Sequence, residues 1–197
     1  MTEAHIFALG LALACLAGVR AYLTVFGVGL AGLLGWVDLP AALEATTSPW
    51  VLGTAGALAL VEFALDKVPG VDSGWDLVQT LARVPAGAFL AAATLSDTGE
   101  LGAGALALGG GAALATHALK AGSRALINAS PEPVSNWTAS VGEDVAAVGA
   151  LALVFAHPWW ALGLLLAVLA LTALVVATVA RWLWRRVRPA TTAAAAR

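Results

Sequence analysis

Charged residues are scarce in this chain. Only 11% of its 197 residues are Asp, Glu, Lys or Arg, whereas 60% are hydrophobic, and the mean hydropathy is +0.88. Soluble globular domains carry charge on about a quarter of their residues. The shortage of charge therefore argues against an ordinary soluble domain and indicates a polytopic membrane protein, with the lipid bilayer as its main partner.

Several chemical signals are also missing. The single cysteine, Cys15, excludes an internal disulfide, and we interpret it as a small buried residue. The opening Met-Thr-Glu-Ala-His has no basic stretch typical of a cleaved signal peptide, so the first apolar segment should stay in the mature protein. No nucleotide-binding loop, zinc-ligand spacing or Ser-His-Asp order occurs. We therefore expect no cofactor, no metal, no catalytic residue and no nucleic-acid partner, and a non-enzymatic role is favoured.

Long apolar segments predict an all-α bundle of membrane helices. A spanning helix needs about 20 mostly apolar residues. About six segments qualify, at residues 4–36, 49–66, 77–95, 101–128, 138–155 and 161–184. The first segment is too long for one straight crossing, so it should tilt, break or fold back, with its natural break at 17–20. The third contains Arg83 and Pro85, which is typical of a broken or re-entrant helix.

A short internal match suggests a repeat. Ala17-Gly-Val-Arg20-Ala-Tyr-Leu matches Ala121-Gly-Ser-Arg124-Ala-Leu-Ile, each followed by a polar loop and a helix. We interpret this as two three-helix repeats, residues 4–95 and 101–188, which an odd number of crossings would make inverted. They would form one transmembrane domain, residues 1–188, followed by a disordered alanine-rich tail at 189–197.

Basic residues predict the orientation in the membrane. Arg181, Arg185, Arg186 and Arg188 crowd the C-terminal end. Because cytoplasmic segments carry an excess of Lys and Arg, we place this end in the cytoplasm. Counting six crossings backwards puts the N-terminus there too. We therefore predict a multi-pass protein of the cell (inner) membrane, and a homo-oligomer is compatible with the sequence.

The remaining polar residues predict a site in the cytoplasmic half. Charges cost about 2.5–3.5 kcal/mol each at the centre of a spanning helix, so several at depth imply pairing around a wet vestibule. We expect substrate-binding roles for Arg20, Lys120, Arg124 and Asn136, proton-coupling or ion-pair roles for Glu62, Asp66, Glu143 and Asp144, and secondary roles for Arg83, His117, Lys67 and Asp72. The loop carboxylates Asp72, Asp76 and Glu132 favour a solvated face.

The leading functional hypothesis is a small transporter or flippase-like protein. Its cations would hold an anionic group, such as a phosphate or an anionic lipid headgroup, because the planar donors of arginine bind phosphate bidentately. The carboxylates would couple this step to protons. Three alternatives stay open. They are a membrane enzyme acting on lipid phosphates, a cation or metal channel or carrier with carboxylate ligands, and a purely structural membrane protein.

Four ordered motifs carry a family resemblance. They are Ala-Gly-Val-Arg20-Ala-Tyr-Leu, Val-Glu62-Phe-Ala-Leu-Asp66-Lys-Val-Pro-Gly-Val-Asp72, Arg83-Val-Pro-Ala-Gly and Lys120-Ala-Gly-Ser-Arg124-Ala-Leu-Ile-Asn-Ala-Ser-Pro-Glu132-Pro-Val-Ser-Asn136-Trp. With these motifs the chain resembles an uncharacterised, mostly bacterial membrane-protein family, domain of unknown function 4126. The resemblance covers nearly the whole chain. It implies an integral membrane protein and supplies no activity.

Overall fold

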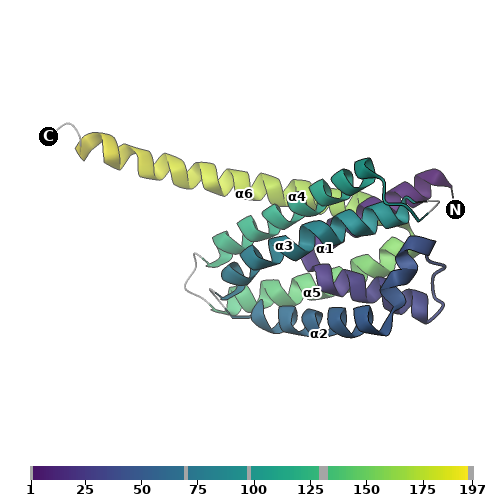
Figure 1. Ribbon diagram of the computed structural model, residues 1–197. Helices are drawn as coiled ribbons and strands as arrows, with labels where there is room; N and C mark the ends of the chain where they lie inside the picture. Colours follow the sequence, from purple (N-terminus) through teal and green to yellow (C-terminus); the bar gives the residue numbers. More distant parts are fainter. Residues whose placement is uncertain (1, 69–70, 97–98, 129–132, 195–197) are drawn as a thin grey trace.

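The computed structural model is a bundle of helices (Figure 1). It describes residues 2–68, 71–96, 99–128 and 133–194. Its elements are α1 (Glu3–Leu33), the 3-10 helix η1 (Ala41–Thr47), α2 (Pro49–Leu65), α3 (Val71–Thr94), α4 (Ala103–Asn128), α5 (Pro133–Ala156) and α6 (Pro158–Ala194). Since the described residues contain no strand, the all-α prediction is confirmed.

Several helices are suited to cross a membrane. By length and composition the described residues offer four, Glu3–Leu33, Gly74–Thr94, Trp137–Ala156 and Pro158–Trp182. A fifth would be the pair formed by η1 and α2, which is bent by 66°. These apolar helices support a multi-pass membrane protein, but the expected six crossings are not confirmed.

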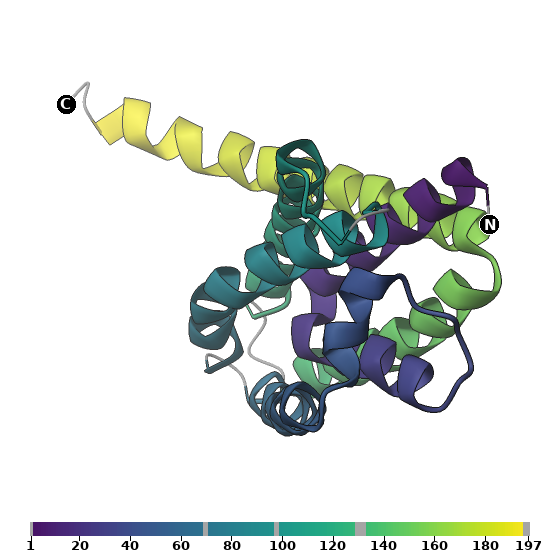
Figure 2. The ribbon, with the colours of Figure 1, turned by 45° about the vertical axis from the view of Figure 1, so that its right-hand side comes forward.

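The first helix is broken at Arg20. This residue has φ −143° and ψ 79°, which interrupts the helical backbone, and the chain turns back there (Figure 2). We call residues 3–19 the first arm of α1 and residues 21–33 the second arm. Non-helical backbone inside an apolar bundle needs partners for its polar groups. Here the hydroxyl of Thr24 donates to the Arg20 carbonyl at 2.7 Å, and Lys120 donates to the Val19 carbonyl at 3.4 Å.

Neighbours along the two arms establish the reversal. In the first arm, Gly10 lies against Thr94 at the end of α3, whereas Gly18 lies against Thr116 of α4, further toward the opposite end of the bundle. After Arg20 the chain runs back toward the end where it began. Gly27 lies against Leu151 in the second half of α5, and α5 leads to the start of α6 beside His5. Of the three expectations for the first segment, the folded-back hairpin is therefore the one observed.

Small residues pack the first arm against α3 and α4. A Cβ atom on Gly18 would collide with the backbone of Ala113, and one on Gly109 would collide with the Gly87 carbonyl. Such contacts between backbones are typical of membrane helix interfaces with small residues. The sequence predicts such an approach from Gly109 and Ala113, two small residues four apart on one face of the helix, and the contacts confirm it.

The prediction of a broken or re-entrant helix in the third segment is wrong. Residues 71–94 form one continuous helix, α3, with Pro85 inside it. A proline removes one intrahelical hydrogen bond but does not oblige the chain to change direction. Two other helices are longer than expected. The polar residues from Pro133 onward already belong to α5, and α6 continues to Ala194.

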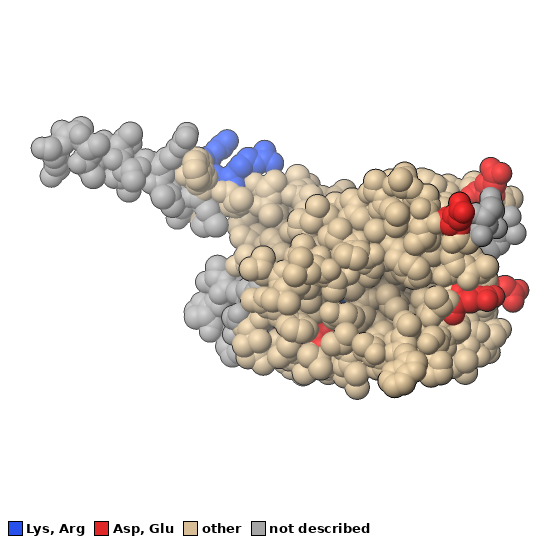
Figure 3. All heavy atoms as spheres, viewed as in Figure 1, with Lys and Arg blue, Asp and Glu red and all other residues tan. Residues whose placement is uncertain are grey.

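The ends of the bundle differ in charge. His5 near the start of α1 contacts Trp159 at the start of α6, with ring centroids 6.5 Å apart, and α6 then extends to the opposite end. Exposed carboxylates gather at the first end, and exposed arginines lie toward the far end of α6 (Figure 3). The N- and C-terminal parts of the chain therefore lie at opposite ends of the bundle.

Candidate functional site

Ten charged side chains meet around the break in α1. We call them the charge cluster. Its cations are Arg20, Lys67, Arg83, Lys120 and Arg124, and its carboxylates are Glu62, Asp66, Asp76, Glu143 and Asp144. Five positive and five negative groups make the cluster neutral when all ten are ionised.

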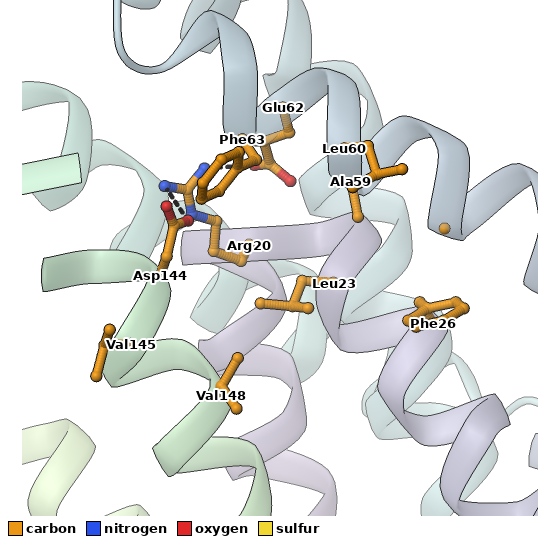
Figure 4. A pocket seen from close by; sticks show the side chains of 11 residues that line it. Arg20, Leu23, Phe26, Ala59, Leu60, Glu62, Phe63, Asp144, Val145 and Val148 are labelled. Atoms are coloured by element: carbon orange, nitrogen blue, oxygen red, sulfur yellow. Dashed lines mark ion pairs between the residues drawn. The ribbon is translucent and has the colours of Figure 1, made fainter. Parts of the chain in front are cut away.

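Arg20 lies at the centre of the cluster. Its Nη1 is 2.5 Å from Asp66 Oδ2. Its Nη2 is 2.7 Å from Asp144 Oδ1, and Figure 4 shows this ion pair. Glu62 and Glu143 lie further out, each 3.8 Å from the guanidinium. The break in the helix places this one side chain between the end of α2 and α5, so it joins elements that are far apart in the sequence.

Arg83 connects α3 to α2 and α4. It contacts Glu62 at 2.8 Å, Asp76 at 2.9 Å and Nδ1 of His117 at 2.7 Å. Because a guanidinium can only donate, Nδ1 of His117 must accept. The proton of a neutral imidazole then resides on Nε2, which lies 2.8 Å from the hydroxyl of Thr80.

Two cations of α4 face carboxylates of other helices. Lys120 lies 2.9 Å from Asp66 and 3.4 Å from Asp76. Arg124 holds Glu143 bidentately, with Nε to Oε1 at 3.0 Å and Nη2 to Oε2 at 2.9 Å. A planar, two-point pair of this kind fixes geometry as well as charge.

Lys67 closes the cluster at its more exposed edge. Its Nζ lies 3.0 Å from Asp144 and also donates to the Phe63 carbonyl at 3.0 Å. The same ammonium lies 3.1 Å from the centroid of the Phe63 ring, which is a cation–π contact. The side chains of Lys67, Asp144 and Glu143 are 14%, 16% and 22% exposed.

The cluster is buried and is not the open polar vestibule that we expected. Seven of its ten members are between 0% and 6% exposed. Burying charge is costly unless each group is paired, and here each carboxylate lies within 4 Å of a cation. Pairing by direct contact replaces the water that an open vestibule would supply.

Asp66 lies one residue past the end of α2, and its ionisation reflects this pairing. Burial by itself would raise the pKa of Asp66. The positive charges of Lys120 and Arg20 outweigh burial and hold the pKa below its ordinary value. The ionised form is therefore the one that the folded protein stabilises.

Most of the predicted site residues come together. The structure gathers Arg20, Lys67, Arg83, Lys120, Arg124, Glu62, Asp66, Glu143, Asp144 and His117 in or against the charge cluster. The side chains of Asn136 and Asp72 lie outside the described part of the structure. The proximity of the ten gathered residues is a geometric finding. The roles that we assigned to them in binding and proton coupling stay predictions.

The sequence analysis did not assign three polar residues of α3 to the site. Asp76 was assigned to a solvated face, yet it is 3% exposed and pairs with Arg83 and Lys120. Gln79 is 1% exposed, and Thr80 contacts His117. The available signal was helical spacing. Asp76, Gln79 and Arg83 are three and four residues apart and therefore share one face of α3.

A groove with apolar walls begins at the charge cluster. We give this name to two neighbouring cavities of about 580 and 530 Å³, which are both lined by the side chains of Leu23, Phe26 and Val148. Both lie between the second arm of α1 and α5, and α2 adds Gly56 and Ala59 to the wall of the first (Figure 4). This groove was not predicted, because each of its apolar wall residues is indistinguishable in sequence from an ordinary lipid-facing one.

The cluster is not built like a metal site. Among the described residues, no three His, Cys, Asp or Glu side chains are placed to hold one ion. The carboxylates instead face Lys and Arg.

The family model described as Domain of unknown function (DUF4126) matches residues 7–178. Comparisons with curated proteins and with solved structures give no significant match.

Proposed function

The chain belongs to the DUF4126 family, which supplies no activity, and we propose from its charge cluster that it moves an anionic, phosphate-bearing substrate together with protons across the membrane. One observation carries the proposal. Four of the five cations, Arg20, Arg83, Lys120 and Arg124, come from α1, α3 and α4. Four of the five carboxylates, Glu62, Asp66, Glu143 and Asp144, come from α5, the last turn of α2 and the residue that follows α2.

This segregation links the substrate to protons. In the arrangement observed, carboxylates occupy the donors of the cations, so an anion must displace them. When α2 and α5 move away, the cations of α1, α3 and α4 form an anion site. The released carboxylates then take up protons, because isolated charges in an apolar bundle are costly. Anion and proton are thus bound in the same state, in the manner of a symporter.

Topology is a second part of the proposal. We propose that α1, although long and apolar enough to cross, folds back without crossing, and that α2 to α6 make five crossings, which adds α4 to the apolar candidates given above. With the basic end of α6 in the cytoplasm, the C-terminus is cytoplasmic and the N-terminus lies outside. This replaces the expectation of six crossings with two cytoplasmic termini. Single cysteines introduced at Thr2 or Arg185 of a Cys15→Ala variant, labelled with a membrane-impermeant reagent, test the orientation.

The two inverted repeats stay a proposal as well. The matched arginines, Arg20 and Arg124, pair with the adjacent carboxylates Asp144 and Glu143 of α5. That arrangement is compatible with a duplicated element in which each repeat supplies one arginine to a shared site. We also propose that the protein lies in the cell membrane.

Flux into vesicles tests the transport role. Purified protein is reconstituted, and two probes are followed under an imposed proton gradient. One is uptake of radiolabelled inorganic phosphate, and the other is transfer of a tail-labelled phospholipid between leaflets. We expect protein-dependent flux of at least one probe, lost in Glu62→Gln and reduced at least tenfold in Arg20→Lys, which keeps the charge but not the two-point geometry.

Asp38→Asn, which removes an exposed charge outside the cluster, serves as the control and should transport like the wild type. Absence of protein-dependent flux of both probes, or equal flux in the wild type and both cluster variants, would overturn the proposal. The latter result, combined with lower stability of the variants, would instead support a structural role for the charge cluster.

A further inference from the structure

The apolar groove has the dimensions of a lipid chain. Along α5 it extends from Asp144 to Ala156, which is about 18 Å at 1.5 Å per residue. One leaflet contributes about half of a hydrocarbon core that is about 30 Å thick. A chain from one leaflet therefore matches the length of the groove, and its walls offer apolar contact along that length.

The groove ends on buried charge at Arg20. Glu62 and Asp144 line this end with it. Two polar atoms there have neither a hydrogen-bond partner nor an ion-pair contact among the described residues. They are Nε of Arg20, which is a donor on a cation, and Oε2 of Glu62, which is an acceptor on an anion. Both side chains are 1% exposed. Buried unpaired groups are costly, so each is a candidate to meet a ligand.

These two atoms call for complementary charges on one molecule. A phosphate oxygen complements the Arg20 donor, and a protonated amine complements the Glu62 acceptor. We propose that the groove binds a phospholipid whose headgroup carries both a phosphate and a protonated amine. Its acyl chain lies along the groove, and its headgroup lies at the charged end, with the phosphate toward Nε of Arg20 and the amine toward Oε2 of Glu62. The inference rests on the proposed function and narrows its substrate to a zwitterionic lipid, in which the phosphate is the anionic group that the cations bind and the amine neutralises Glu62 in place of a proton.

Other ligands satisfy fewer features of the site. Inorganic phosphate would leave the apolar walls unused. A phospholipid with a phosphate but no amine would leave the Glu62 oxygen without a donor. A quaternary ammonium headgroup carries the positive charge but has no N–H to donate. A primary amine therefore distinguishes the proposed lipid from these three.

Lipid selectivity is measured by native mass spectrometry of the full-length protein in detergent. Equimolar phosphatidylethanolamine, phosphatidylglycerol and phosphatidylcholine with identical chains are offered together. We expect phosphatidylethanolamine to be retained about tenfold over the other two, the size of one hydrogen bond to a charged group. Glu62→Gln should retain lipid but lose this preference, and excess inorganic phosphate should not displace the bound lipid.

A matched pair of substitutions tests the groove itself. Val148→Trp fills the point that both cavities share and should lower retention of phosphatidylethanolamine at least tenfold. Val175→Trp makes the same change on α6 at a residue of similar exposure, 51% against 57%, that borders neither cavity, and should have no effect.

Equal retention of the three lipids, or equal loss in both tryptophan variants, would overturn the site, because either result describes unspecific lipid around the bundle. The assay measures binding and not movement. Selective binding without vesicle flux would therefore refute the transport role and leave the lipid site standing.

Discussion

The two arms of α1 share one helix but pack in opposite ways. The first arm contacts α3 and α4 through backbone, at positions such as Gly18 against Ala113, where no added atom would fit. The second arm contacts α2 and α5 through side chains, and leaves the groove beside Leu23 and Phe26. One side of the bundle is therefore tightly packed, and the other retains open volume.

The difference shows where a movement would take place. Small-residue interfaces hold α1, α3 and α4 close together, so these helices would stay together. The helices α2 and α5 border the groove and carry most of the carboxylates. Ion pairs join the two sides, such as Arg124 with Glu143 and Arg83 with Glu62. We call these ion pairs together the latch. Each prediction below probes one side of this comparison or the latch.

Breaking the latch should have the largest effect. Asp66→Asn removes the charge that faces both Arg20 and Lys120 and leaves two buried cations underpaired. Removing one partner of a buried pair costs about 3–5 kcal/mol. We expect a large fall in the midpoint of thermal unfolding in detergent. The same change at the exposed Asp38 should alter stability by less than about 0.5 kcal/mol. Equal midpoints for the two variants would contradict the latch.

The packed side should resist a single added methyl group. A Cβ on Gly109 would collide with the Gly87 carbonyl and with Ala91. We expect Gly109→Ala to destabilise the protein by about 1–3 kcal/mol, as overpacking does. Gly111 of the same helix has nothing within 4 Å of such an atom, so Gly111→Ala should gain up to about 1 kcal/mol of helix propensity. Similar unfolding midpoints for the two variants would show that this interface is not tight.

The open side should tolerate the same change. A Cβ on Gly56 would lie 3.1 Å from the edge of the Phe26 ring, and that ring borders the groove into which it can turn. We expect Gly56→Ala to change stability by less than about 1 kcal/mol, because a mild contact offsets the gain in helix propensity. A Cβ on Gly53 would have nothing within 4 Å, so Gly53→Ala should show only the gain in stability from helix propensity. A loss as large as that of Gly109→Ala would contradict the distinction between the two sides.

The sequence predicted the helices and most of the charge cluster for one physical reason. Ionised groups in an apolar bundle must meet partners, so Arg20, Glu62 and Arg124 could be assigned to a common site without coordinates. The close contact at Gly109 followed equally from residue size. Both inferences depend on local chemistry alone, which a single sequence displays directly.

Other features depend on how helices are placed relative to one another. Arg83 with Pro85 suggested a break that α3 does not have, whereas the break predicted at residues 17–20 is present at Arg20, where Thr24 and Lys120 satisfy the backbone. Asp76 was assigned to solvent because it follows a turn, yet α4 covers it and supplies Lys120. The groove is a gap between helices, and no residue type marks a gap. These outcomes are set by tertiary packing.

The smallest effect should be the response of the latch to acid. Because Lys120 and Arg20 hold the pKa of Asp66 below its ordinary value of 3.8, ionised Asp66 stabilises the fold fully above that value. This contribution is lost as pH falls through the lower, folded-state pKa. The difference in unfolding midpoint between the wild type and Asp66→Asn should therefore be full at neutral pH and narrow below pH 3.8. The difference between the wild type and Asp38→Asn should stay small throughout. If the Asp66 difference instead widened in acid, the pairing of Asp66 with the cations of the packed side would not stabilise its ionised form.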